Sequence, residues 1–114
     1  MVDSNELYSR AMRATVKFLE QKNYLVVEKL FSENIDLVCM DSLDDIHFIK
    51  VSISPDVLPS EDDIKELRPK LEKEALDFFS KNPEYTGRCT FDTISMVVIN
   101  DNKAFLRFHQ NCFN

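Results

Sequence analysis

Apolar residues recur at helical spacing in two long stretches of the chain. Residues 4–22 carry apolar side chains three and four positions apart, and Ser4 stands where an N-cap would start the helix. The same spacing returns from Ser60, a second N-cap candidate followed by acidic residues, to about Ser80. Pro69 lies inside this second stretch and, because proline removes a backbone hydrogen bond, it predicts either a kink or two separate helices. The apolar positions in phase are Leu7, Ala11, Ala14, Phe18 and Leu19, then Ile64, Leu67, Leu71, Ala75 and Phe78.

Shorter apolar stretches between and after the helices are typical of β-strands. Because side chains alternate along a strand, Ile35, Leu37 and Cys39 are expected to share one face, and Ile49 and Val51 to share a face of the next strand. The polar run DSLDD between these two strands predicts a hairpin turn. The expected strands are residues 24–31, 34–40, 46–53, 90–100 and 104–109.

The order of these elements is helix, three strands, helix, two strands. A helix between the third and fourth strands permits them to pair in parallel. We therefore expect an α/β or α+β fold, with a mixed sheet of about five strands flanked by helices. No internal repeat or linker divides the chain, so residues 1–114 are expected to form a single domain.

Composition narrows the protein class. The chain is 44% hydrophobic, with nine phenylalanines and one glycine, which excludes disordered and low-complexity classes. No apolar run approaches the roughly 20 residues of a membrane span. The amino terminus has no basic, apolar leader, and three widely spaced cysteines suggest a reducing compartment, so a cytoplasmic location is expected.

The net charge of the chain and the placement of its basic residues bear on whether its partner is a nucleic acid. The formal net charge is −6, which disfavours non-specific nucleic-acid binding. Basic residues nevertheless gather on the first helix, and Arg10, Arg13, Lys17 and the strand residue Lys50 are candidate nucleic-acid contacts. The alternative interpretation is an ordinary solvated helix face.

Four sequence stretches occur in the order of a known family. They are ATVKFLEQKNYLVVEK, ENIDLV, FIKVS, and TFDTISMVV followed by FHQNCF. They are similar to an opening helix and strand, to GEIDLI, to FVEVK, and to RFDVVAV with a HIPNAF-type terminus. Over about residues 8–113 the chain thus resembles the YraN-like predicted nucleases of the restriction-endonuclease-like PD-(D/E)XK superfamily. The resemblance implies a restriction-endonuclease-like mixed sheet.

The resemblance also implies where a nuclease site would lie. In that superfamily an Asp, a Glu and a Lys hold a divalent cation and the attacking water. Here Asp36 matches the Asp, but Lys50 stands for the Glu and Ser52 for the Lys. Asn34 and Met12 replace two further acids. Our hypothesis is that Lys50 pairs with Asp36 in place of a metal, because a half-buried carboxylate needs a compensating cation.

These departures predict a catalytically inactive relative of a small metal-dependent nuclease. It would act by binding nucleic acid or a protein partner, or by self-assembly into a homodimer, with no cofactor. The alternative is an active DNA endonuclease using Mg²⁺ or Mn²⁺ at Asp36, with Asp92 or a nearby acid as the second carboxylate. A third alternative is a purely structural subunit.

The remaining candidate residues fit no catalytic motif. His47 and His109 lack metal-ligand spacing, and His47 is expected to be an ordinary strand residue. With Gly87 as the only glycine, no phosphate-binding glycine loop is present in the sequence. Phe78, Phe79, Phe91, Phe105 and Phe108 are expected in the core, although an exposed subset would suit a dimer or partner surface.

Overall fold

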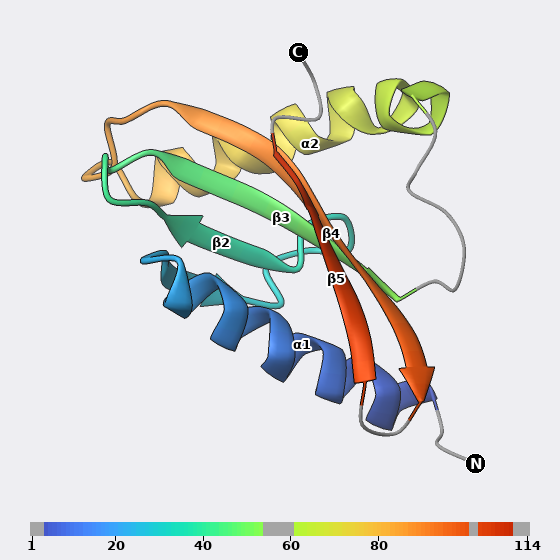
Figure 1. Ribbon diagram of the computed structural model, residues 1–114. Coiled ribbons are helices and arrows are strands. Elements are labelled where there is room, and N and C mark those ends of the chain that lie inside the picture. Colours follow the sequence, from blue (N-terminus) through green and yellow to red (C-terminus); the bar gives the residue numbers. More distant parts are fainter. Residues whose placement is uncertain (1–3, 54–60, 101–102, 111–114) are drawn as a thin grey trace.

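A computed structural model describes residues 4–53, 61–100 and 103–110 of the protein. The expected cap at Ser60 and the turn at residues 101–102 lie outside the described residues. The predicted order of elements and the mixed α+β class are confirmed (Figure 1). The elements are α1 (Ser4–Gln21), β1 (Leu25–Lys29), β2 (Leu37–Met40), β3 (Ile46–Ile53), α2 (Glu61–Lys81), β4 (Cys89–Asn100) and β5 (Lys103–His109).

The strands form one mixed sheet in the order β1-β2-β3-β4-β5. Neighbouring strands are antiparallel except β3 and β4, which are parallel, as the intervening helix α2 permits. The predicted hairpin between β2 and β3 is confirmed. Its turn is held by Asp41, whose Oδ1 accepts hydrogen bonds from the backbone amides of Leu43 and Asp45 at 2.8 and 3.1 Å.

The two faces of the sheet bury separate cores. Leu37, Cys39, Ile49 and Val51 pack with Leu19 of α1. On the other face, the α2-side core joins residues of the sheet and of the segment before β2 to residues of α2: Ile35, Val38, Ile46 and Phe48 with Leu71, Ala75 and Phe78. The alternation predicted for β3 is confirmed. The face predicted for Ile35 is wrong, because β2 begins only at Leu37 and the chain before it follows no strand alternation.

The helix ends explain how the chain enters and leaves the sheet. After α1, Asn23 adopts a left-handed conformation (φ 66°), and the amide of Tyr24 donates to the Leu19 carbonyl at 3.0 Å. Helix α2 runs unbroken through Pro69, so of the two predicted alternatives, a kink or two separate helices, the second is wrong. Pro69 is exposed, and on a solvent-facing side of a helix water can hydrate the carbonyl that loses its partner. Within the described part of the chain, neither helix is long and apolar enough to cross a membrane.

The phenylalanines divide between core and surface. Phe78, 1% exposed, makes ring contacts at 5.5–5.7 Å with four aromatic residues of the α2-side core: Phe31, Phe48, Phe79 and Tyr85. Phe108 is half-buried against Phe18. Phe105 on β5 is 61% exposed, so the core position predicted for it is wrong. Its strand is the last of the sheet.

Candidate functional site

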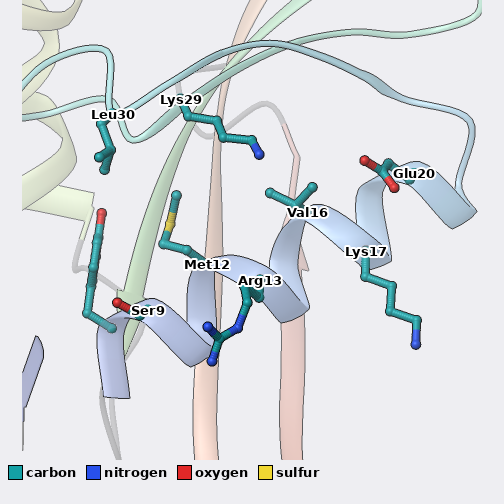
Figure 2. Close-up of a pocket in the computed structure, with 9 residues that line it drawn as sticks. Ser9, Met12, Arg13, Val16, Lys17, Glu20, Lys29 and Leu30 are labelled. Carbon is teal, nitrogen blue, oxygen red and sulfur yellow. The ribbon is translucent and has the colours of Figure 1, made fainter. Parts of the chain in front are cut away.

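A groove of about 480 Å³ runs between α1 and the end of β1. Figure 2 shows Met12 and Val16 pointing from the helix toward the strand, while Lys29 and Leu30 reach back from the strand side. The lining residues are Tyr8, Ser9, Met12, Arg13, Val16, Lys17 and Glu20 from α1, and Lys29 and Leu30. The groove is therefore formed by residues of one helix and of one edge strand.

The groove combines an aliphatic floor with a mainly cationic border. Met12 and Val16 pack against the α1-side core, which fixes the floor. The border carries three exposed cations, Arg13, Lys17 and Lys29, against one acid, Glu20. None of these three cations makes an ion pair within the described part of the chain. Their charges therefore remain available to an anionic ligand.

Leu30 closes the groove in an unfavourable backbone conformation. Its φ is 53°, in the left-handed region that leucine adopts at a cost of about 1–2 kcal/mol. Its amide donates to the Asp36 carbonyl at 2.6 Å, which holds this turn, and its side chain is 68% exposed. A strained residue that presents an apolar side chain to solvent is a candidate for a ligand contact.

Asp36 lies beside the groove and joins α1 to the sheet. Tyr8 Oη donates to Asp36 Oδ1, and the Val51 amide donates to Oδ2, each at 2.6 Å. Burial, followed by the hydrogen bond to Asp36 and its negative charge, raises the pKa of Tyr8 to about 12. Both carboxylate oxygens thus have protein donors, and the arrangement serves to position the helix.

Replacing Tyr8 by phenylalanine is expected to lower the free energy of unfolding by about 1–2 kcal/mol, because Asp36 loses a charge-assisted hydrogen bond. The stability from this bond is complete below the ordinary tyrosine pKa of 10.0 and is lost as pH rises through about 12. Urea denaturation measures the first effect, and phenolate absorbance during alkaline titration measures the second.

Tyr85→Phe is the matched control, because the Tyr85 hydroxyl makes no hydrogen bond among the described residues. Equal losses in the two variants would contradict a specific role for the Tyr8–Asp36 bond.

The residues expected to form a degenerate nuclease site are not brought together. Met12 lies in the groove, whereas Lys50 and Ser52 alternate with Val51 and so occupy the opposite face of the sheet. Ser52 Oγ lies 3.2 Å from Ser95 Oγ on β4. The hypothesis that Lys50 pairs with Asp36 is wrong, since within the described residues Asp36 is bonded by Tyr8 and Val51 instead.

The other residues predicted for a functional site also lie apart from one another in the structure. Asn34 Nδ2 donates to Glu74 Oε1 of α2 at 3.2 Å, on the side of the sheet away from the groove. Of the four predicted nucleic-acid contacts, Arg13 and Lys17 line the groove. Arg10 is on the same helix but forms an ion pair with Glu6 at 3.2 Å, and Lys50 lies on the opposite face of the sheet.

His47, expected from the sequence to be an ordinary strand residue, is instead the centre of a network of polar and acidic side chains. Its Nδ1 lies 2.6 Å from Asp92 Oδ2, and its Nε2 lies 2.8 Å from Asp41 Oδ2. Thr90 Oγ1 is 2.9 Å from Nδ1, and the Tyr24 ring packs edge-on against the imidazole at 4.9 Å. Burial alone would lower the pKa of His47, but the hydrogen bonds and charges of the two aspartates raise it. His47 therefore joins the β2–β3 turn to β4.

Asp92 is the predicted second carboxylate for a metal at Asp36. It is 2% exposed and is hydrogen-bonded to His47. Across the described ranges, no group of three or more His, Cys, Asp or Glu side chains is placed to hold a metal ion. Cys39 is buried in the core, Cys89 is exposed, and Cys112 lies outside the described residues.

No protein-family model matches the chain, and no curated protein is significantly similar to it in sequence. The resemblance to YraN-like nucleases therefore rests on the four sequence stretches alone.

Proposed function

We propose that the protein is a non-catalytic binding protein whose α1–β1 groove takes an acidic segment of a partner protein. The observation that carries this proposal is the set of three exposed cations, Arg13, Lys17 and Lys29, around an aliphatic floor. Because the chain is acidic overall, with a formal net charge of −6, a cationic groove is a local departure that an acidic segment would complement.

The same proposal treats the chain as an inactive relative of small metal-dependent nucleases. A nuclease of the resembled type needs carboxylate oxygens free to bind a cation. Both oxygens of Asp36 instead accept hydrogen bonds from Tyr8 and Val51. Lys50 stands where the metal-binding Glu is expected, so this position offers no carboxylate, and its side chain lies on the opposite face of the sheet.

A protein segment suits the groove better than single-stranded nucleic acid. Proteins that bind single strands combine cations along the backbone with aromatic side chains on which bases stack. Here the floor is Met12 and Val16, and the one aromatic side chain among the described lining residues, Tyr8, is held by Asp36. Aliphatic side chains of a peptide would fill the floor, and its carboxylates would meet the cations.

Reversing the charge of Lys17 and Lys29 together is expected to weaken binding of an acidic peptide by about tenfold or more, since each border charge contributes modestly. Fluorescence anisotropy with a labelled peptide of alternating glutamate and leucine measures this, beside an oligothymidylate of similar length. The matched control is Lys81→Glu, whose lysine pairs with Asp77 on α2, away from the groove.

Leu30→Asn separates binding from folding. Asparagine tolerates the left-handed conformation, so stability is expected to rise by about 1 kcal/mol while peptide binding falls.

Two results would contradict the proposal. If the protein binds oligothymidylate in preference to the peptide, and this binding requires Lys17 and Lys29, the partner is a nucleic acid and not a protein. Mn²⁺-dependent DNA cleavage that disappears in Asp36→Ala would overturn the non-catalytic proposal.

A further inference from the structure

The sheet has two edges, and they differ in how well they are protected. β1 has five residues, and its pairing with β2 is interrupted by an irregularity between Val26 and Glu28. Its exposed positions include the charged residues Glu28 and Lys29. Short length, a bulge and charge are the devices by which proteins prevent an edge strand from pairing with another chain.

β5 has fewer of these devices, since Arg107 is an exposed charge on it but the strand is longer and its pairing is more regular than that of β1. It has seven residues, and its pairing with β4 runs without a shift from Ala104 to His109. Phe105 is 61% exposed on this strand, and no described segment pairs with its outer edge. A long, regular edge strand that presents a phenylalanine is suited to pairing with a further strand.

The side chains on β5 indicate which strand would pair there. Leu106 and Phe108 pack toward the α1-side core, so Phe105 and Arg107 lie together on the other face, and both are exposed. When β5 pairs antiparallel with a copy of itself about Leu106, Phe105 of each copy lies opposite Arg107 of the second copy. Each dimer then gains two cross-strand pairs between a guanidinium and an aromatic ring.

Neighbouring registers lack this complementarity. A two-fold axis at Arg107 would place the two Arg107 side chains opposite each other, and like charges directly opposite are destabilising. A two-fold axis at Phe105 would pair the two rings and leave Arg107 without an aromatic partner. From the longer, regularly paired edge strand and this self-complementary sequence, we infer that the protein forms a two-fold dimer by antiparallel pairing of β5 with β5, centred on Leu106.

Sedimentation equilibrium on the full chain tests this pairing through two opposite substitutions at one position. Phe105→Lys sets a lysine opposite Arg107 of the second copy at two places, and is expected to weaken the dimer about tenfold or more. Phe105→Glu sets a glutamate opposite Arg107, and is expected to leave the dimer within about threefold of the wild type. Because Phe105 is largely exposed, both variants should fold, which circular dichroism checks.

The charge balance makes this comparison stringent. Each copy has a formal net charge of −6, so general repulsion between copies would favour the lysine variant over the glutamate variant, the reverse of the expected ranking. Leu76→Lys and Leu76→Glu are the matched controls, because Leu76 is 71% exposed on α2 rather than on the sheet edge.

Three results would overturn the inference. The first is a wild-type protein that stays monomeric at the highest concentration measured. The second is a dimer that Phe105→Lys leaves unchanged. The third is equal weakening by Phe105→Lys and Phe105→Glu, which would mean that the ring is needed but does not face Arg107. A dimer lost only in Phe105→Lys, with both Leu76 variants unaffected, supports it.

Discussion

Replacing His47 by glutamine is expected to lower the free energy of unfolding by about 3–5 kcal/mol, the usual cost of removing one partner from a buried ion pair. His47 is 6% exposed, and its two ring nitrogens face Asp92 at 2.6 Å and Asp41 at 2.8 Å. Glutamine keeps a hydrogen-bond donor of similar size but carries no charge. Two carboxylates would then remain close together without the cation between them.

The same network predicts how stability depends on pH. The pKa of His47 is raised above its ordinary value of 6.5, because the two aspartates outweigh the effect of burial. A raised pKa contributes stability that is complete below 6.5 and is lost as pH rises through the folded-state value. Burial would raise the pKa of Asp41, but hydrogen bonds from His47 and the turn amides lower it below 3.8. That contribution is present above 3.8 and is lost as pH falls.

Urea denaturation across this pH range measures both contributions. Wild-type stability is expected to be greatest between about 4 and 6.5 and to decline at higher pH, and His47→Gln is expected to abolish the alkaline decline. His109→Gln is the control, because His109 is exposed and its replacement should cost less stability than the loss of the buried His47. An unchanged pH profile in His47→Gln would contradict a charged, doubly bonded His47.

Replacing Phe78 by alanine is expected to lower the free energy of unfolding by about 3–5 kcal/mol, since it removes a buried ring and leaves a cavity. Phe78 is 1% exposed, and its ring contacts come from three other parts of the chain as well as from α2: Phe31, Phe48 and Tyr85 lie within 5.7 Å.

Leu76→Ala provides the comparison on the same helix. Leu76 is two residues from Phe78 but 71% exposed, so its loss should be less than about 0.5 kcal/mol. Urea midpoints at one pH give both values. Similar losses in the two variants would mean that the α2 face against the sheet has been assigned incorrectly.

Much of the fold could be predicted because local hydrophobic periodicity agrees with it. The spacing in α1 and the alternation in β3 correspond to faces that the structure buries. Predictions failed where tertiary context decides. Pro69 does not end α2, Ile35 precedes the regular part of β2, and Phe105 belongs to a strand whose outer side no described element covers.

The candidate site was only partly predictable for a related reason. Arg13 and Lys17 stand out as basic residues on a helix, but Lys29 and Leu30 join them only because β1 runs beside α1. The His47 network depends on residues 45 positions apart in the chain for one of its bonds. No spacing rule connects such residues, so polar residues at strand positions, such as His47 and Asp92, are the one signal the sequence offered.

The parallel pairing of β3 with β4 has a consequence for the order of folding. The β2–β3 and β4–β5 hairpins each join residues close in the chain, whereas Ile46 pairs with Cys89 across all of α2. Closing such a loop costs more chain entropy than closing a hairpin, so the two halves of the sheet should meet late. The bonds from His47 to Thr90 and Asp92 cross this boundary. These bonds would then mainly lower the rate of unfolding, because they hold together two halves of the sheet that assemble separately.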